Sequence, residues 1–233
     1  MSRKGNSRHI KRLAASKYMG IERKAAKYTI KPKPGRHSLA KSIALASLIR
    51  NKLHSASTMK EAVKVIKQGS IEVNGVSLKD AKQAIGYGDI IKIKPTEEYF
   101  KIEVNRQGAI KVEKSSTEPK RIAKILGKYV SKANTFMIRL HDGTVMRIPN
   151  GMKISTNDSV LISNNKIEQV LKLEQGASCV IYNGRHTGEK GTIKSITKGN
   201  ALERAHVEIE TDSGTVQTLL DNIIVTGASN ARQ

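Results

Sequence analysis

Lysine and arginine dominate the first sixty residues, and their cations are the side chains that pair best with phosphate oxygens. This segment has sixteen such residues and a single acid, Glu22. The bases are Arg3, Lys4, Arg8, Lys11, Arg12, Lys17, Arg23, Lys24, Lys27, Lys31, Lys33, Arg36, Lys41, Arg50, Lys52 and Lys60. Like charges at this density repel one another. The pattern therefore indicates a polyanionic partner that supplies the missing negative charge.

The positive charge is concentrated at one end of the chain. The formal net charge is +22, yet residues 173–233 contain six bases and seven acids. This asymmetry indicates binding to nucleic acid or to an anionic membrane surface. The chain has two Phe, six Tyr and no Trp, so few side chains are available to stack on bases. We therefore expect phosphate contacts and recognition of shape to outweigh stacking.

Catalytic and metal-binding patterns are not apparent. The six histidines form no H-x₃-H or H-E-x-x-H pair, and Cys179 has no second cysteine. The Gly-rich stretch 183–191 fails the phosphate-loop pattern, because Glu189 follows Gly188 and Gly191 follows Lys190. No Ser, His and Asp set stands out. We predict no catalytic residue, no metal site, no cofactor and no small-molecule substrate, and therefore a protein that is not an enzyme.

The elements that must position these cations begin with an arm. Residues 1–36 show little periodicity and end in the breaker Lys33-Pro34-Gly35, so we expect disorder that resolves on contact with the partner. Helical spacing of apolar residues predicts one helix over 38–53, capped by Ser38. A second helix begins with a Thr58–Glu61 capping box. Asn74-Gly75 then predicts a type I′ hairpin, and a strand follows at 90–93.

The remainder of the chain has the alternation of β-strands. Hairpins are predicted for 99–112, 135–148 and 160–170, and one helix for 120–130. Five short strands follow, at residues 178–182, 192–196, 206–210, 215–219 and 223–225, and their spacing suggests a small barrel. The single cysteine and the absence of an apolar signal region favour the cytosol.

Two stretches resemble known RNA-binding modules. The helix–helix–hairpin unit, from Ser38-Leu39-Ala40-Lys41 through Ile49–Leu53 to Gln68–Val76, is similar to the S-four RNA-binding domain. The stretch Gly176–Tyr182 through Gly188–Ile193 resembles a KOW motif. Arg8-His9-Ile10-Lys11-Arg12-Leu13 precedes both, and this order resembles the small-subunit ribosomal protein S-four-e family of archaeal and eukaryotic ribosomes.

The resemblance implies an α+β, multi-module fold. Its parts are a basic N-terminal arm at 1–37, a small α/β S-four RNA-binding domain at 38–96, a mostly β central domain at 97–172 and a C-terminal KOW-type small β-barrel at 173–233. It also implies a structural constituent of the small ribosomal subunit, located in cytoplasmic ribosomes and supporting translation. The expected partners are small-subunit ribosomal RNA and neighbouring small-subunit proteins.

The expected RNA contacts combine the basic pattern with this resemblance. They are Arg3, Lys4, Arg8, His9, Lys11, Arg12, Lys31, Lys33, Arg36, His37, Lys41, Arg50, Asn51, Lys52, Lys60, Lys64, Lys67, Arg185, Lys190 and Lys194.

Two alternatives remain at this point. A free RNA-binding or RNA-modification accessory factor would need clustered acids or a cofactor loop, and residues 97–172 show neither. A membrane-surface protein would need large apolar anchors beside the charge, whereas residues 8–18 offer only Ile10, Leu13 and Tyr18. We therefore expect no membrane partner.

Overall fold

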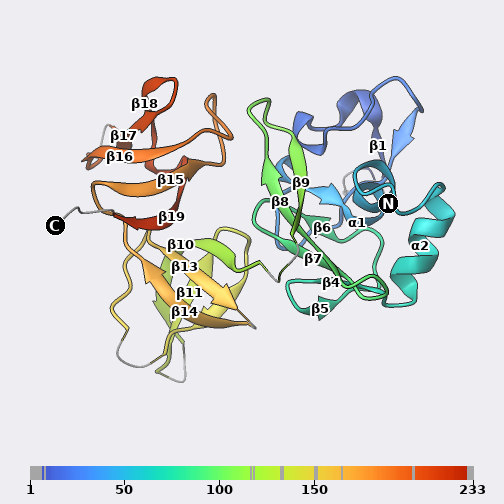
Figure 1. The fold of residues 1–233 in the computed structure, drawn as a ribbon, viewed down its shortest axis with the longest axis horizontal. Helices are drawn as coiled ribbons and strands as arrows, with labels where there is room; N and C mark the ends of the chain where they lie inside the picture. The colour runs from blue at the N-terminus through green and yellow to red at the C-terminus, as the bar shows by residue number, and fades with distance from the viewer. Residues whose placement is uncertain are drawn as a thin grey trace, which may run out of the picture. The chain divides into compact units, whose positions relative to one another are not determined.

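A computed structural model provides the structure (Figure 1). It describes residues 7, 9–115, 117, 119–131, 134–149, 152–163, 165–200 and 203–229. The chain divides into two compact units. The N-terminal unit comprises residues 1–102 and 109–117, and the C-terminal unit comprises residues 103–108 and 118–233. Strands make up most of the regular secondary structure in the described residues, and two short α-helices lie in the N-terminal unit.

The arm is folded from residue 9 onward, so the prediction that it lacks structure is wrong for the described residues. Its elements are β1 (Ile10–Lys11), β2 (Tyr28–Thr29) and 3-10 helices at Arg12–Ala14 and Lys17–Met19. β1 and β2 pair antiparallel. Tyr18 and Met19 are buried, while Leu13 is 69% exposed. These buried side chains and the hydrogen bonds of Arg12 hold the arm in its fold. The sequence of the arm shows no regular apolar spacing that would predict them.

The helix predicted over 38–53 begins seven residues later than expected. The elements here are a 3-10 helix at Leu39–Lys41, β3 (Ile43–Ala44), α1 (Leu45–Asn51) and β6 (Ala84–Ile85). Ile43 pairs with Ile85 in a strand, although its apolar spacing in the sequence is that of a helix. Leu39 is 43% exposed and does not belong to the buried stripe. Tertiary pairing has overridden the local helical pattern.

The second helix follows its prediction. α2 (Met59–Lys67) begins with a capping box, in which Glu61 N donates to Thr58 Oγ1 at 3.3 Å and Thr58 N donates to Glu61 Oε2 at 3.2 Å. Ala62 and Ile66 are fully buried on its inner side. The two reciprocal bonds satisfy backbone donors that the first turn leaves without partners.

A five-stranded sheet completes the N-terminal unit, in the order β5-β4-β7-β8-β9. The strands are β4 (Ile71–Val73), β5 (Val76–Ser77), β7 (Ile90–Ile93), β8 (Glu98–Val104) and β9 (Ile110–Ser115). The predicted hairpin turn is confirmed, since Asn74 and Gly75 have φ of 53° and 78°. The sheet crosses the predicted domain boundary between 96 and 97, and the four-part division stays a prediction.

The C-terminal unit begins with a sheet in the order β12-β11-β10-β13-β14. Its strands are β10 (Arg121–Val130), β11 (Phe136–Leu140), β12 (Val145–Arg147), β13 (Ser159–Ser163) and β14 (Lys166–Leu171). The predicted helix at 120–130 is therefore wrong. A register shift between Ile125 and Gly127 interrupts the alternation of the strand and leaves Leu126 42% exposed. Because of this irregularity, the apolar residues of the strand are spaced as they would be in a helix.

The second sheet of this unit has the order β18-β17-β16-β15-β19 and is antiparallel throughout. Its strands are β15 (Ala177–Ile181), β16 (Lys190–Thr197), β17 (His206–Thr211), β18 (Gly214–Leu219) and β19 (Ile223–Ser229). All five predicted strands are present, and closure into a barrel stays a prediction. Cys179 lies in the core, where burial raises its thiol pKa to about 12.

Candidate nucleic-acid interface

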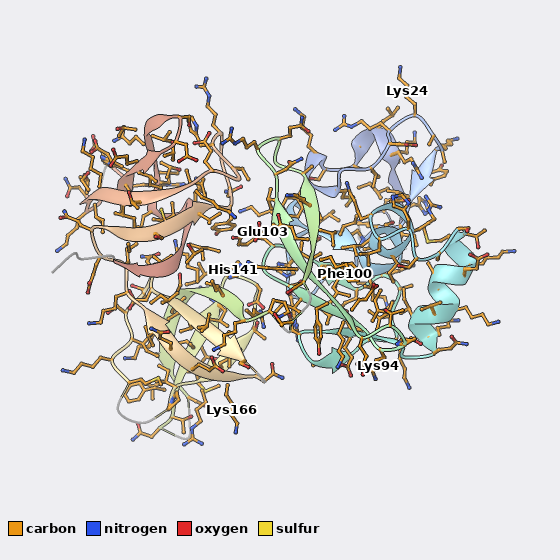
Figure 2. The ribbon with its side chains drawn as sticks, in the orientation of Figure 1. Lys24, Lys94, Phe100, Glu103, His141 and Lys166 are labelled. Atoms are coloured by element: carbon orange, nitrogen blue, oxygen red, sulfur yellow. The ribbon has the colours of Figure 1, made fainter. Side chains whose placement is uncertain are left out.

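A basic pocket of about 420 Å³ lies on the arm, and we call it the arm pocket. Its described lining is Lys11, Leu13, Arg23, Lys24, Ala26 and Lys27. All six residues are exposed, and Figure 2 shows the Lys24 side chain extending away from the ribbon. Four of these six residues are cations and none is an acid. Such a surface attracts anions and lets phosphate oxygens approach several donors together.

Arg12 holds the two sides of the arm pocket in place. Its backbone N donates to Lys27 O at 3.1 Å. Its guanidinium donates to Glu22 O at 2.8 Å and, more weakly, to Tyr28 O at 3.4 Å. These bonds tie the loop that contains Arg23, Lys24 and Lys27 to the strand that contains Lys11. Arg12 is only 6% exposed, so its predicted role as an RNA contact is replaced by a structural one.

His37 is also an internal contact, contrary to its prediction. Its Nε2 lies 2.8 Å from Asp89 Oδ2, and both side chains are at most 5% exposed. Asp89 Oδ2 also accepts from Gly86 N at 2.9 Å. A Cβ atom at Gly86 would lie 2.4 Å from His37 Nδ1, so glycine makes room for the ring. The pair anchors the end of the arm, and its burial keeps the ring away from phosphate.

Exposed rings lie next to the arm pocket. His9 and Tyr28 are both exposed, and their rings meet edge-to-face at 5.9 Å. Lys27 Nζ lies 5.6 Å from the Tyr28 ring centroid. His9 is therefore exposed, and its role as an RNA contact stays a prediction. The group offers a nucleic acid two exposed rings next to the cations of the arm pocket.

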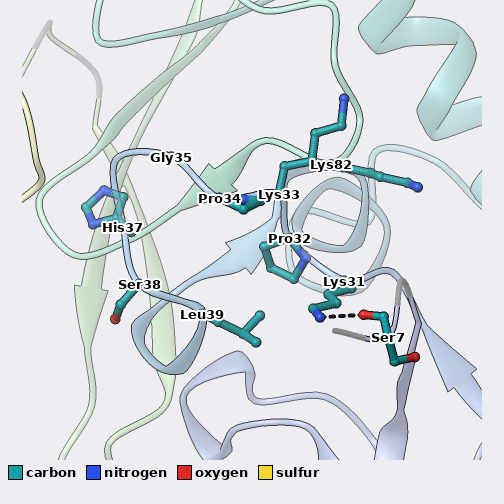
Figure 3. Close-up of a pocket in the computed structure, with 10 residues that line it drawn as sticks. All are labelled: Ser7, Lys31, Pro32, Lys33, Pro34, Gly35, His37, Ser38, Leu39 and Lys82. Atoms are coloured by element: carbon teal, nitrogen blue, oxygen red, sulfur yellow. Dashed lines mark hydrogen bonds between the residues drawn. The ribbon is translucent and has the colours of Figure 1, made fainter. Parts of the chain in front are cut away.

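A larger pocket of about 890 Å³ surrounds the Pro-Lys-Pro-Gly segment, and we call it the proline pocket (Figure 3). Its described lining is Ser7, Lys31, Pro32, Lys33, Pro34, Gly35, His37, Ser38, Leu39 and Lys82. Lys31 Nζ donates to Ser7 O at 2.6 Å. Lys33 pairs with Asp80, and this hydrogen bond lowers the pKa of Asp80. Lys82 is exposed at the edge of the pocket, whereas much of the charge of Lys33 is balanced.

The helical region presents a second basic surface. Lys60, Lys64 and Lys67 are exposed on α2 at a spacing that brings them to one side of the helix. Arg50 is half-buried at the end of α1, and its Nε donates to Asn51 Oδ1 at 2.9 Å. This bond orients the guanidinium while the terminal nitrogens stay available for other partners.

Two lysines near the helices are partly enclosed. Lys41 is half-buried, and desolvation lowers the pKa of its ammonium group. Lys52 lies against the arm, since a Cβ at Gly20 would be 2.8 Å from Lys52 Nζ. Arg36 is also half-buried.

The basic residues predicted in the C-terminal unit are exposed, and one of them lies near an acid. Arg185, Lys190 and Lys194 are exposed, and Lys190 Nζ lies 3.8 Å from Glu103 Oε2. Their role in RNA binding stays a prediction. Arg3, Lys4 and Arg8 lie outside the described residues.

Four cations of these pockets were absent from the predicted contact set: Arg23, Lys24, Lys27 and Lys82. Their charge was visible in the sequence. Their grouping was not, because it depends on the pairing of β1 with β2 and on the Arg12 bonds.

Metal and membrane sites receive no support from the described part of the chain. No group of three potential metal ligands is found there. None of the helices in the same residues is long and apolar enough to cross a membrane.

Acid-poor cationic surfaces on a mostly β chain are typical of nucleic-acid-binding proteins. The profile described as Ribosomal family S4e matches residues 96–168, and the RS4NT (NUC023) domain profile matches residues 4–40. The chain is 34% identical to small ribosomal subunit protein eS4 of Aeropyrum pernix, over 97% of this chain and 94% of the relative. It is 32% identical to the protein of the same name from Methanococcus aeolicus, over 97% of each chain.

A solved structure gives the same result. The crystal structure of the 30S ribosomal protein S4e from Thermoplasma acidophilum superposes with a TM-score of 0.66 at 25% identity. The match covers 81% of this chain and 96% of that one. The chain belongs to the S4e family of ribosomal proteins.

Proposed function

We propose that this protein is a structural constituent of the small ribosomal subunit, where it binds small-subunit ribosomal RNA and supports translation in the cytoplasm. The observation that carries the proposal is 34% identity, over 97% of the chain, to a small ribosomal subunit protein. The role is architectural, and the protein is not an enzyme. Neighbouring small-subunit proteins are its other partners.

The arm pocket is the principal phosphate contact in this proposal. Its four cations meet no acid in the described lining, and Arg12 fixes them before the RNA arrives. Pre-organised cations lose less conformational freedom on binding than flexible ones do. The lysines of α2 and the guanidinium of Arg50 extend this contact over the helical surface.

The finer assignment of modules also belongs to the proposal. Two helices followed by a hairpin at Asn74-Gly75 support an S-four RNA-binding domain at 38–96. Gly191 supports a KOW-type barrel at 173–233, because a Cβ there would lie 2.2 Å from Glu210 O. The near-neutral charge of the second module makes it the weaker RNA contact, suited to a protein neighbour.

The salt dependence of RNA binding tests the proposed contact. Replacing Lys11, Arg23, Lys24 and Lys27 with Gln removes all four cations of the arm pocket. We expect the slope of log K against log salt to become shallower by roughly 0.7–0.9 for each phosphate that is no longer neutralised. The matched control removes four cations from the C-terminal unit, at Lys190, Lys194, Lys198 and Arg204. An equal or larger change of slope in the control would reject the arm pocket as the principal contact.

A further inference from the structure

In the first sheet of the C-terminal unit, six residues of β10, β11 and β12 point away from the hydrophobic core that this sheet covers. Cross-strand pairing aligns Tyr129 with Met137 and Met137 with Arg147. The neighbouring row aligns Gly127 with Arg139 and Arg139 with Val145. Alternate strand residues point to opposite sides, so these six residues share one face. Ile138 and Leu140 point the other way and are fully buried. We call the six-residue surface the outer face.

Most residues of the outer face are exposed. Tyr129 is 46% exposed and Val145 is 43% exposed. Arg139 and Arg147 are also exposed. Gly127 has no side chain, and a Cβ there would lie 3.8 Å from Arg139 Nη2, so the guanidinium lies over the glycine. One aromatic ring and two guanidinium groups are therefore presented by adjacent strands of a single sheet.

The chemistry of the outer face selects among partners. Its polar groups are two arginines and a tyrosine hydroxyl, and none of its six residues is an acid. An apolar protein surface would strip water from both guanidinium groups without pairing them, which is costly. RNA offers phosphates for the charges and flat bases for the tyrosine ring and the guanidinium planes. Duplex RNA keeps its bases stacked inside, so only unpaired bases can lie on the ring.

We propose that the outer face binds unpaired bases of RNA, with one base stacked on Tyr129 and the adjacent phosphates held by Arg139 and Arg147. The inference rests on the proposed function, because it takes RNA as the partner. The outer face would add a second RNA contact whose affinity comes largely from base stacking. That affinity should therefore depend less on salt concentration than the affinity of the arm pocket does.

The absence of tryptophan makes a direct test available, because Tyr129→Trp creates the only tryptophan in the chain. The full-length variant is titrated with an eight-nucleotide single-stranded oligoadenylate and, separately, with inorganic polyphosphate. A base that stacks on the indole quenches its fluorescence, whereas phosphate alone does not. Phe136→Trp is the matched control, since Phe136 is 51% exposed in the same hairpin and lies on the opposite face.

We expect the oligonucleotide to quench Tyr129→Trp strongly, and we expect polyphosphate to leave it unchanged. Phe136→Trp should respond weakly to both. Equal quenching in the two variants, or quenching of Tyr129→Trp by polyphosphate, would overturn the inference.

Affinity measurements complete the test. Tyr129→Ala should weaken binding of the oligonucleotide by roughly 5- to 150-fold, the range for loss of one stacked base, while Tyr129→Phe retains it. An equal loss in Tyr129→Phe would assign the effect to the hydroxyl and reject stacking. Filter binding of small-subunit ribosomal RNA separates the two proposals. If the Tyr129→Trp variant binds that RNA strongly and its fluorescence stays constant, only the outer face is rejected.

Discussion

Lys11 and Arg12 are neighbours in the sequence, yet they face different surroundings. Lys11 is exposed in the arm pocket, while Arg12 is buried and donates to two backbone carbonyl groups. A guanidinium can satisfy several acceptors in one plane, which suits it to an internal position where an ammonium would leave acceptors without partners. Charge alone does not distinguish the two roles.

The same substitution at both positions tests this distinction. We expect Arg12→Met to lower the free energy of unfolding by about 1–3 kcal/mol, because two partly buried hydrogen bonds to backbone carbonyl groups are lost. Lys11→Met should change the stability by less than about 0.5 kcal/mol and weaken RNA binding. Denaturant titration and filter binding of both variants measure the two effects. Equal stability of the variants would contradict the structural role of Arg12.

Arg50 is expected to contact phosphate directly. Its Nε donates to Asn51 Oδ1, which orients the guanidinium without using its terminal nitrogens. Arg50→Ala should therefore weaken RNA binding by about 1.5–3 kcal/mol with little change in melting temperature. Lys194→Ala, at an exposed position in the near-neutral sheet, should cost less. A larger effect of Lys194→Ala in filter binding would move the principal contact to the C-terminal unit.

Lys124 is a cation that has no place in the RNA interface. It is fully buried in the C-terminal unit, and its Nζ donates to Leu220 O at 2.5 Å. Burial lowers the pKa of Lys124 from 10.5 to about 8, and Asp221 opposes this effect. Below pH 8 the ammonium is charged in both states, and its burial destabilises the fold. Between about pH 8 and 10.5 the folded state binds fewer protons than the unfolded state, so this penalty is relieved as the pH rises.

Comparison with Lys124→Met isolates this effect from the titration of other lysines. We expect the free energy of unfolding of the native chain to rise relative to Lys124→Met between pH 8 and pH 10, by an amount on the order of 2 kcal/mol. Denaturant titrations at several pH values provide the measurement. A constant difference between the two proteins across this range would contradict this account, because it would mean that Lys124 binds its proton equally well in the folded and unfolded states.

The stability of α2 affects both the fold and the candidate interface. Its capping box fixes the first turn, and the exposed lysines at 60, 64 and 67 depend on the helix for their alignment. Thr58→Ala should lower the free energy of unfolding by about 1 kcal/mol, because Glu61 N loses its acceptor. Ser57→Ala is the matched control, since Ser57 contributes its backbone N–H to Glu61. Equal melting temperatures for the two variants would contradict this assignment.

The elements that sequence predicted well are those with local causes. The capping box and the Asn74-Gly75 turn are determined by side chains within a few residues of one another. The elements that it missed depend on distant partners. Residues 121–130 have the apolar spacing of a helix, but they lie between β11 and β13 and form a strand. Ile43 similarly takes a place opposite Ile85, a pairing that no local pattern reveals.

The candidate site was predictable to the same degree. An excess of bases with one acid in sixty residues indicated the class of partner and the part of the chain that we propose binds it. It did not reveal that Arg12 and His37 are buried, since that requires the Arg12 carbonyl contacts and the His37–Asp89 pair. It also missed the outer face, where strand pairing brings Tyr129 into line with Arg147 across Met137.

For the molecule as a whole, the two units differ in charge. This difference suggests which unit contacts RNA and which contacts protein in the small subunit. The acid-poor arm and helices belong to the N-terminal unit, while residues 173–233 are close to neutral. We propose that most of the protein's affinity for RNA comes from phosphate contacts of the N-terminal unit. The near-neutral end is free of the charge repulsion that would oppose a protein neighbour.

Sedimentation of the native protein tests membership of the small subunit most directly. Extracts are washed in moderate salt and separated on a sucrose gradient, and the protein is quantified in each fraction relative to small-subunit RNA. We predict close to one copy of the chain per small subunit, retained after the wash. Recovery of most of the protein in the free soluble fractions would contradict the proposal.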